Sequence, residues 1–432
     1  MDHRLHILIA DYVPIANKGE EAIVRGIEDM LSEGRPVALG LFDNVPQATQ
    51  RENLTLFPRD WLFRLEGNSA LSGSGRILLQ ALISLQLRLG IYGPLRNLAS
   101  ARTEACRPLA DFFDRAQYVL VGHDGVFGVE SCGIIHLARQ RGKRVGILGA
   151  STGLGGGRWY KAWLYRRTME ECDFCFFREP HSCASLKQVC SDPGKLRVAP
   201  DPAFAMRPAP LEAARDVLER CEPHRSARQS HRPVIAVTAL EKGRVYAGFR
   251  PDLHGQAKRQ AHAQYLAAIL DTLIDKYHAF VLLLPHSVET DASDAVAARH
   301  VIEQMKATPA DYAILEQDCG PRVLKSIIRE CDFLVGERTH SVIGSVSVGT
   351  PFAALTNRQD TRTHGIIGAM CRCEDQIVDM DSASEQEAAQ RICELFETRD
   401  TTRRSLDGIR EELSRQIEET VRTIKGLQGS AS

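Results

Sequence analysis

The most restrictive feature of this sequence is the repeated alternation of short apolar runs with longer segments of helical spacing. The run LHILIAD, at 5–11, is followed by apolar side chains that recur at helical spacing as far as Gly34, and PVALGLF, at 36–42, begins the pattern again. Short runs this rich in apolar residues are typical of strands buried on both faces of a parallel sheet. The alternation therefore predicts an α/β fold with doubly wound parallel sheets.

The alternation is interrupted once. From Met206 to Pro233 the sequence is polar, rich in Arg and Pro, and without a strand pattern, and the rhythm resumes at VIAVTAL. A length of 432 residues agrees with two domains. We therefore predict two Rossmann-like domains that face a cleft, with ligands bound at the carboxyl ends of the strands. The predicted boundaries are 1–205 for the N-terminal domain, 206–232 for a linker, and 233–432 for the C-terminal domain with its terminal helices.

Charge and hydropathy exclude several classes of function. The formal net charge of −1 gives no reason to expect binding to nucleic acid. The opening residues lack the long apolar region of a secretory signal, and no apolar stretch reaches the length that spans a bilayer. We expect a cytoplasmic protein. Two stretches that mix apolar and basic residues, 74–98 and 158–167, suggest peripheral contact with the inner face of a membrane, but helices packed on the core or on a second subunit fit them as well.

The chain has twelve cysteines, and two pairs of them lie close together in sequence. The pairs are Cys172 with Cys175 and Cys371 with Cys373. A structural zinc site usually needs two such pairs at suitable spacing, and the second pair here has only one residue between its members. We predict no metal site and interpret these cysteines as buried free thiols.

The segment VGERTHSVIGSVSVGTP places charged and titratable residues where a buried strand meets a helix. A helix that begins near Ser341 would offer free N–H groups and the positive end of its dipole to an anion. Arg338 can bind a carboxylate or phosphate through two hydrogen bonds, and His340 can exchange a proton near neutral pH. A surface arginine and a core histidine bound to the backbone are an equally good interpretation of these residues.

This segment resembles the polysaccharide pyruvyl transferase family. The resemblance extends from Leu5 to about Met370, because further motifs follow in the same order as in the family. They are NKGEEAIVRGIEDML at 17–31, VGHDGVFG at 121–128, FFREPHSCASL at 176–186, APDPAF at 199–204 and LLLPHS at 282–287. The resemblance implies a fold of the glycosyltransferase-B type. It also implies transfer of a pyruvyl group from phosphoenolpyruvate to a sugar as a ketal, with phosphoenolpyruvate as co-substrate and no cofactor.

The resemblance also implies residues on the donor side. By position, Arg178, Arg338 and Ser341 would bind phosphoenolpyruvate, and His340 would be the catalytic proton donor and acceptor. Arg362 stands where relatives usually have lysine, so the positive charge is kept with different hydrogen-bond geometry. For Arg178, a structural salt bridge to Glu179 or Asp201 is the alternative.

On the acceptor side we predict residues in three strand-end loops. They are Asn17, Gly19 and Glu20 after the first strand, Asp124 in VGHDGVFG, and His286 after LLLP. A helix start, a simple turn and a structural histidine are the respective alternatives.

Two further functions stay open. The same fold could serve a glycosyltransferase that uses a nucleotide-sugar donor, or a binding protein without catalysis. The sequence names neither the acceptor sugar nor the hydroxyls that are bridged. Whether that sugar is lipid-linked, and what oligomer the chain forms, stay open as well.

Overall fold

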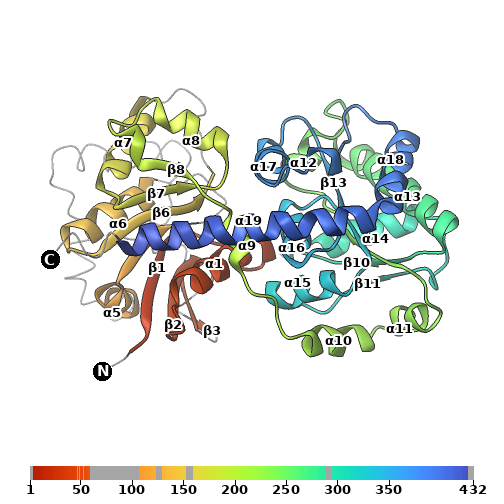
Figure 1. The fold of residues 1–432 in the computed structure, drawn as a ribbon, viewed down its shortest axis with the longest axis horizontal. Helices are drawn as coiled ribbons and strands as arrows, with labels where there is room; N and C mark the ends of the chain where they lie inside the picture. The colour runs from red at the N-terminus through yellow and green to blue at the C-terminus, as the bar shows by residue number, and fades with distance from the viewer. Residues whose placement is uncertain are drawn as a thin grey trace. The chain divides into compact units, whose positions relative to one another are not determined.

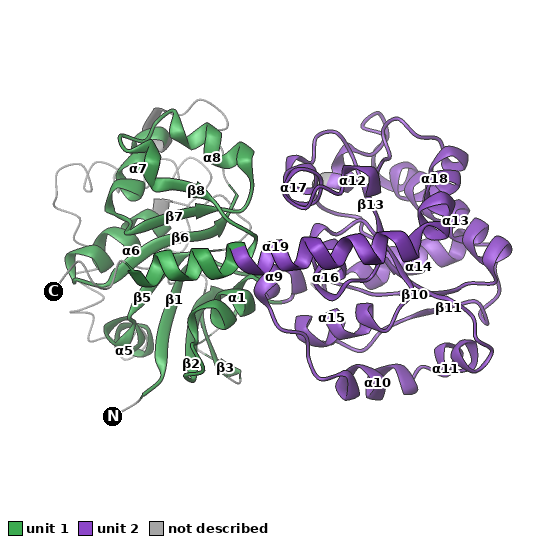
Figure 2. Cartoon of the chain, in the orientation of Figure 1, with its two compact units in different colours: residues 1–15, 23–202, 416–432 green, residues 16–22, 203–415 purple. Residues whose placement is uncertain are grey.

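The computed structural model describes residues 3–45, 47, 49–51, 53–58, 107–122, 129–151, 159–288 and 293–426. Internal contacts divide the chain into two compact units (Figure 2). Unit 1 consists of Met1–Ile15, Ile23–Pro202 and Gln416–Ser432, and unit 2 of Ala16–Ala22 and Ala203–Arg415. The predicted domain boundaries stay predictions. The units add a short N-terminal segment to unit 2 and the end of the last helix to unit 1.

Unit 1 is built on one sheet whose strands run in the order β3-β4-β2-β1-β5-β6-β7-β8 (Figure 1). The neighbours are parallel except for the antiparallel pair β3 and β4. The strands are β1 (Leu5–Tyr12), β2 (Val37–Asp43), β3 (Thr49–Arg51), β4 (Leu54–Pro58), β5 (Tyr118–Val121), β6 (Arg144–Ala150), β7 (Phe174–Phe177) and β8 (Leu196–Val198). The described helices are α1 (Lys18–Leu31), α5 (Arg107–Arg115), α6 (Val129–Gln140), α7 (Trp159–Glu171) and α8 (Pro180–Lys187), with a 3₁₀ turn at Pro193–Lys195.

Unit 2 has a fully parallel sheet in the order β11-β10-β9-β12-β13-β14. Its strands are β9 (Val234–Thr238), β10 (Phe280–Leu283), β11 (Tyr312–Ile314), β12 (Phe333–Gly336), β13 (Phe352–Thr356) and β14 (Ile377–Asp379). In sequence terms this is the order 3-2-1-4-5-6 of a dinucleotide-binding fold, whose ligand crevice opens where the order reverses. The reversal lies between β9 and β12.

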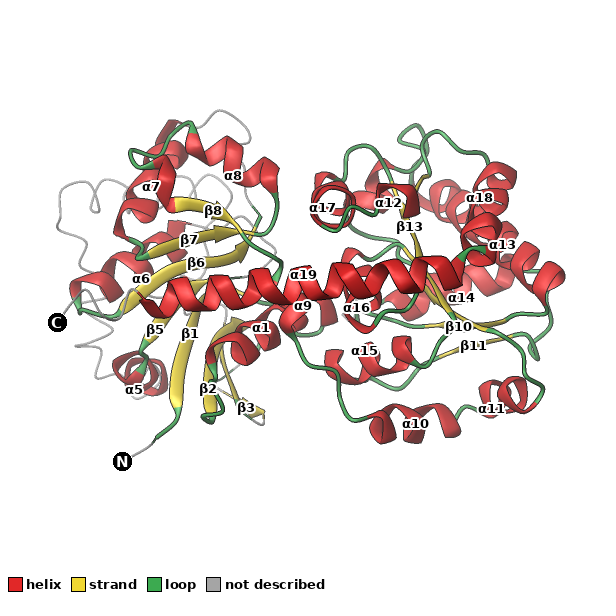
Figure 3. Ribbon diagram, in the orientation of Figure 1, coloured by secondary structure: helices red, strands yellow, loops and turns green. Residues whose placement is uncertain are grey.

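Helices or helical turns lie between consecutive strands of unit 2, as the predicted alternation requires, and further helices precede β9 and follow β14 (Figure 3). They are α9 (Pro202–Ala205), α10 (Leu211–Glu219), α11 (Glu222–Gln229), α12 (Arg244–Gly248), α13 (Gly255–Tyr277), α14 (Asp294–Gln304), α15 (Pro321–Arg329), α16 (Thr339–Val348), α17 (Thr361–Thr363), a π-helix at His364–Met370, a 3₁₀ turn at Glu374–Gln376, α18 (Glu385–Glu397) and α19 (Arg399–Gly426). The predicted linker, 206–232, contains α10 and α11, and α10 packs against α15.

The joint between β12 and α16 is tight because β12 ends in a glycine, Gly336. A Cβ added at Gly336 would lie 2.9 Å from Val342 Cγ2 and 3.0 Å from Ser341 Oγ, so glycine lets the strand end approach the helix. At its other end α16 stops at Gly349, which has a left-handed φ of 77°. Arg338 is the N-cap residue of α16. The sequence therefore fixes residues 338–341 at the carboxyl end of β12.

The cysteines and the apolar stretches take ordinary places in the described part of the chain. Cys172, Cys175, Cys371 and Cys373 are buried free thiols. Within the described ranges we find no cluster of three or more potential metal ligands. No helix described here combines the length and the apolar character needed to cross a bilayer. Of the two stretches with apolar and basic residues, 74–98 lies outside the described residues, and most of 158–167 belongs to α7.

Candidate functional site

The predicted joint residues lie at the point where the strand order of unit 2 reverses. Three hydrogen bonds connect the end of β9 with the start of α16. The Arg338 N–H donates to Thr238 Oγ1 at 3.4 Å, Thr238 Oγ1 lies 2.9 Å from Ser341 Oγ, and Ser341 Oγ donates to the Arg338 carbonyl at 2.7 Å. Ser341 is fully buried, so its hydroxyl is used in closing this ring. The ring fixes the backbone from which the Arg338 side chain projects.

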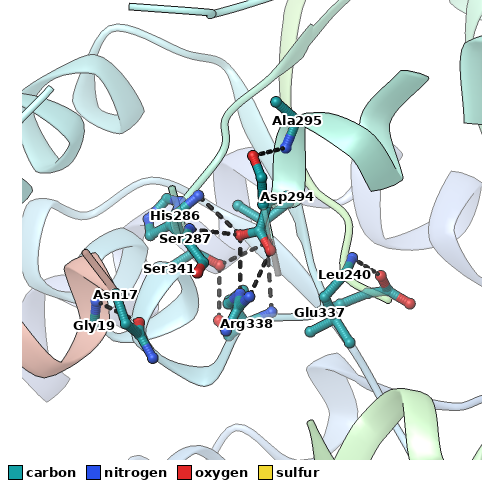
Figure 4. A network of polar contacts seen from close by, with 12 residues as sticks. Asn17, Gly19, Leu240, His286, Ser287, Asp294, Ala295, Glu337, Arg338 and Ser341 are labelled. Carbon is teal, nitrogen blue, oxygen red and sulfur yellow. Dashed lines mark hydrogen bonds and ion pairs between the residues drawn. The ribbon is translucent and has the colours of Figure 1, made fainter. Parts of the chain in front are cut away.

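The Arg338 guanidinium is held by a buried carboxylate (Figure 4). Arg338 Nε donates to Asp294 Oδ2 at 3.0 Å, and Nη2 donates to Oδ1 at 2.5 Å. The Arg338 side chain keeps 18% of its surface exposed, whereas the Asp294 side chain keeps 2%. Asp294 is a residue that sequence reasoning missed. It lies 44 residues before Arg338, and the acidic start of α14 was the only signal that it left.

His286 belongs to the same cluster. Its backbone N–H donates to Asp294 Oδ2 at 2.9 Å, and its Nδ1 lies 3.1 Å from the Leu284 carbonyl (Figure 4). Burial is the main reason that the pKa of His286 is lowered to about 4, and the neighbouring charges of Arg338 and His340 act in the same direction. Nδ1 therefore carries the hydrogen that it donates to Leu284, and the ring is neutral at pH 7.

The segment Ala16–Ala22, which we call the docking segment, belongs to unit 2 and packs beside this cluster. The Lys18 N–H donates to the His286 carbonyl at 2.7 Å, the Val288 N–H donates to the Ala16 carbonyl at 3.0 Å, and Asn17 forms an antiparallel bridge with Ser287. Lys18 Nζ also lies 2.8 Å from Asp318 Oδ1. The docking segment is thus bound to the His286 loop through its backbone, and to Asp318 through the Lys18 side chain.

One of the predicted acceptor residues, Gly19, lies against His340. A Cβ added at Gly19 would lie 2.4 Å from His340 Nδ1, so the imidazole packs directly against the glycine backbone. Asn17 Oδ1 accepts a hydrogen bond from the Gly19 N–H at 3.1 Å. Glu20 is buried in the first turn of α1. The structure therefore gives Gly19 a steric role beside His340 that the sequence pattern did not indicate.

Arg362 is connected to the joint through a chain of hydroxyl groups. Thr339 Oγ1 lies 2.8 Å from Thr363 Oγ1, which donates to Asp360 Oδ2 at 2.6 Å. Arg362 Nε lies 3.5 Å from Asp360 Oδ1, and Asp360 is fully buried. The π-helix begins immediately afterwards at His364. π-Helical turns are frequent at functional sites, and here one follows the loop that carries Arg362.

A second buried carboxylate, that of Glu337, stabilises the end of β12 next to the joint. Glu337 Oε1 lies 2.6 Å from His262 Nε2 on α13, and Glu337 Oε2 accepts a hydrogen bond from the Leu240 N–H at 2.9 Å. The His262 ring lies edge-on to Tyr246 and Phe249, with ring centroids 5.2 Å apart in both pairs. Glu337 therefore ties the loop after β9 to the strand that carries Arg338.

Arg178 lies in unit 1, at the end of β7, and is 1% exposed. Its Nη1 donates to Asp201 Oδ2 at 2.8 Å, and its Nε donates to Ser151 Oγ at 2.6 Å. This is the salt bridge to Asp201 that the sequence left as an alternative. Glu179 instead caps α8, because both of its carboxylate oxygens accept the Ser182 N–H.

Unit 1 has its own reversal of strand order, between β1 and β5, and sequence reasoning missed the residue there. Asp11 Oδ2 accepts a hydrogen bond from the Gly122 N–H at 3.2 Å, and Asp11 Oδ1 accepts one from Ser131 Oγ at 2.5 Å. The carboxylate thus joins the two strands at the reversal. The predicted acceptor residue Asp124 lies outside the described residues.

The three predicted donor arginines share one arrangement, since each has a buried aspartate beside it. The pairs are Arg338 with Asp294, Arg362 with Asp360, and Arg178 with Asp201. A paired carboxylate cancels the formal charge of the guanidinium and fixes its direction. What these pairs provide is therefore oriented hydrogen-bond donors rather than a large net positive charge.

Several solved structures have the same fold as this chain. An α,α-trehalose 6-phosphate synthase from Burkholderia multivorans matches with a TM-score of 0.55 at 10% identity, over 99% of this chain and 100% of that one. A UDP-GlcNAc 2-epimerase from Neisseria meningitidis matches with a TM-score of 0.53 at 13% identity, over 98% and 99%. A glycosyltransferase from Rickettsia africae matches with a TM-score of 0.53 at 9% identity, over 99% and 100%. These matches confirm the predicted fold class, with two Rossmann-like α/β domains of the glycosyltransferase-B type.

Sequence comparison identifies the family. A search of curated proteins finds none that matches this chain. The family model described as polysaccharide pyruvyl transferase matches residues 17–359, well over half of the sequence. The matched range contains all of the docking segment except Ala16, together with the Arg178 motif, the His286 loop and the joint at Arg338 and His340. The chain belongs to the polysaccharide pyruvyl transferase family.

Proposed function

We propose that this protein transfers the pyruvyl group of phosphoenolpyruvate to a sugar of a polysaccharide, or of its lipid-linked precursor, and forms a pyruvate ketal. Membership of the family implies an enzyme of polysaccharide pyruvyl transfer. The observation that carries the finer proposal is the position of Arg338 and His340. They occupy the start of α16 where the strand order of unit 2 reverses, which is where ligands bind in open parallel sheets.

The donor site of this proposal consists of fixed hydrogen-bond donors. Phosphoenolpyruvate carries a phosphate and a carboxylate, and both match a guanidinium in geometry and charge. Arg338 supplies an oriented guanidinium, the first turn of α16 supplies the positive end of a helix dipole, and Arg362 lies on the neighbouring loop. Donors that are fixed before the reaction need little reorganisation when charge develops on the phosphate.

His340 is the proposed proton donor and acceptor. A proton is transferred to the methylene carbon of the enol, and a sugar hydroxyl attacks the adjacent carbon. The bond to the phosphate oxygen then breaks as the second sugar hydroxyl closes the ketal ring. One of the two hydroxyl protons ends on the new methyl group and the other on phosphate, so the reaction is balanced without a redox partner. Imidazole suits this transfer because it exchanges protons near neutral pH.

The acceptor side rests on weaker support, and the roles of its residues stay part of the proposal. Asn17, Gly19 and Glu20 are in the docking segment, and His286 is in the loop to which that segment binds. Asp124 lies outside the described residues. Arg178, which is predicted for the donor, is buried in unit 1. A lipid-linked acceptor would bring the protein to the inner face of a membrane, in agreement with the apolar and basic stretches of the sequence.

The test is to incubate the protein with phosphoenolpyruvate and a panel of sugar acceptors and to measure the release of inorganic phosphate. A pyruvylated sugar should appear in equal amount. His340→Gln should lower kcat by about 10²- to 10⁴-fold, as expected for a lost general acid and base, while phosphoenolpyruvate still binds. Tight binding of a nucleotide sugar without phosphate release from any acceptor would instead favour a glycosyltransferase.

A further inference from the structure

We propose that Asp294 is a positioning residue that orients Arg338 toward phosphoenolpyruvate. The inference rests on the proposed function, because it assumes that Arg338 binds the donor. It concerns a residue outside the strand-end motif, on a helix that lies 44 positions earlier in the chain.

Asp294 is the centre of the polar network in Figure 4. Its Oδ2 accepts hydrogen bonds from the N–H groups of His286 and Ser287, both at 2.9 Å, and from Arg338 Nε at 3.0 Å. Its Oδ1 accepts a hydrogen bond from Arg338 Nη2. All four partners are donors, so the site is built for a carboxylate and not for an amide or a hydroxyl.

The carboxylate cannot move without breaking backbone contacts. Asp294 is the first residue of α14, its side chain is 2% exposed, and its own N–H donates to the Ser287 carbonyl at 2.9 Å. Ser293 caps the same helix by accepting the Ala295 N–H. The guanidinium is therefore bound to a rigid point of the fold, not to a second mobile side chain.

This arrangement matters because an arginine side chain has many rotamers. A long side chain that is ordered only when the ligand binds loses rotamer freedom at that moment, and this loss lowers the affinity. The contact through Nε and Nη2 fixes the plane of the Arg338 guanidinium before phosphoenolpyruvate arrives. A lysine could not use this contact, because an ammonium group has no fixed plane.

The same carboxylate also holds the His286 loop, to which the docking segment binds. Asp294 accepts hydrogen bonds from the N–H groups of His286 and Ser287. The His286 carbonyl accepts the Lys18 N–H, and the Val288 N–H donates to the Ala16 carbonyl. The docking segment in turn places Gly19 against His340. The effect of Asp294 on Arg338 must therefore be separated from a general disturbance of the site.

A double-mutant cycle makes this separation. Asp294→Asn keeps the shape but replaces one accepting oxygen by a donating NH₂ group. It should raise KM for phosphoenolpyruvate by about tenfold, from the lost charge-assisted bonds, and should lower kcat by less than about threefold. In an Arg338→Lys background, the same substitution should raise KM by less than about twofold, because the contact that it removes is already lost.

The matched control is Asp311→Asn. Asp311 also pairs with an arginine in unit 2, since Arg232 Nη2 donates to its Oδ1 at 2.8 Å, but this pair precedes β9 and β11 at the amino ends of the strands. Its KM should stay within about twofold of the unchanged protein. Asp294→Glu keeps the charge but displaces the guanidinium, so it should also raise KM. It provides the measurement if Asp294→Asn does not fold.

The possible outcomes distinguish a failure of the proposed function from a failure of the positioning role of Asp294. If the unchanged protein binds no phosphoenolpyruvate in calorimetry and releases no phosphate, the proposed function is overturned, and this inference with it. If the unchanged protein is active but Asp294→Asn and Asp294→Glu leave KM unaltered, only the positioning role is overturned. An equal rise in KM in both Arg338 backgrounds would also reject it, since a purely structural effect would be additive.

Discussion

Arg338 and Arg178 have the same local setting and different surroundings. Each follows a buried strand, precedes a helix and pairs with an aspartate. Arg338 is bound through two nitrogens and keeps 18% of its side chain exposed, whereas Arg178 binds its aspartate through one nitrogen and keeps 1%. Arg338 lies where the strand order of unit 2 reverses, and Arg178 lies two strands beyond the reversal of unit 1.

The difference shows that a strand-end arginine is not by itself a ligand site. The edge of a parallel sheet offers a crevice only where neighbouring connections leave on opposite faces, and elsewhere helices and loops cover the strand ends. At the covered position of Arg178, the aspartate compensates a charge that is otherwise buried. At the position of Arg338, the aspartate directs a guanidinium that is partly exposed to solvent.

The largest expected effect is on stability, and it concerns Arg178. Arg178→Met removes one partner of a fully buried ion pair and leaves the Asp201 carboxylate without it. The free energy of unfolding should fall by about 3–5 kcal/mol. Calorimetric or urea unfolding measures this change.

Arg338→Met is the matched variant. Asp294 keeps its two backbone N–H partners, and the Arg338 side chain is partly solvated, so the loss should be less than half of that for Arg178→Met. Equal losses from the two variants would show that the two ion pairs are equivalent, and would remove the basis of the comparison.

The second expected effect is a pH dependence of stability, because the Arg338 cluster contains a buried neutral histidine. Burial lowers the pKa of His286 to about 4. Above pH 6.5 neither the folded nor the unfolded state protonates this residue. As the pH falls from about 6.5 to about 4, the unfolded state gains a proton that the folded state does not, so stability is lost by about 3 kcal/mol in total and then levels off.

The contribution of His286 is isolated with His286→Asn, whose amide can replace Nδ1–H as donor to the Leu284 carbonyl. Urea unfolding of both proteins should be followed from pH 7 to pH 4. The difference between their free energies of unfolding should change only in that window. A constant difference would mean that His286 is protonated in the folded state or is not buried.

The sequence predicts the places of both arginines but not their environments. Short apolar runs before FRE and GER predict strand ends, because buried parallel strands have few polar residues. The same periodicity predicted the α/β class and the helix that begins at the joint. These features are local in sequence, and a local pattern is sufficient to determine them.

The partner of Arg338 could not be predicted, because it depends on the strand order, whereas Asp201 is one of the two partners that the sequence offers for Arg178. Asp201 lies 23 residues after Arg178, and Asp294 lies 44 residues before Arg338. Only the order β10-β9-β12 brings the His286 loop beside the Arg338 joint. The contact between Gly19 and His340 could not be predicted either. It forms because Ala16–Ala22 packs in unit 2 with residues 203–415, which lie far from it in sequence.

Affinity for the donor provides the next test of the comparison. Arg338→Lys keeps the charge and loses the planar contact with Asp294, so Kd for phosphoenolpyruvate should rise by about 10- to 100-fold in calorimetry. Arg178→Lys should change Kd by less than about threefold if burial keeps that side chain from the ligand. A similar rise for both variants would support the sequence-based prediction that Arg178 also binds the donor.

The smallest expected effect tests the contact that positions His340. Gly19→Ala adds a methyl group whose carbon would lie 2.4 Å from His340 Nδ1, so the imidazole must move away. We expect kcat to fall by about tenfold, because small displacements of a catalytic group cost this much or more, while KM for phosphoenolpyruvate is retained.

Gly408→Ala is the matched control, since Gly408 also lies within a helix and has no atom within 4 Å of the added carbon. It should leave kcat unaltered and raise stability by up to about 1 kcal/mol through helix propensity. An unaltered kcat in Gly19→Ala would mean that the position of His340 against the docking segment is not needed for turnover, and the special character of the Arg338 cluster would then rest on its arginine alone.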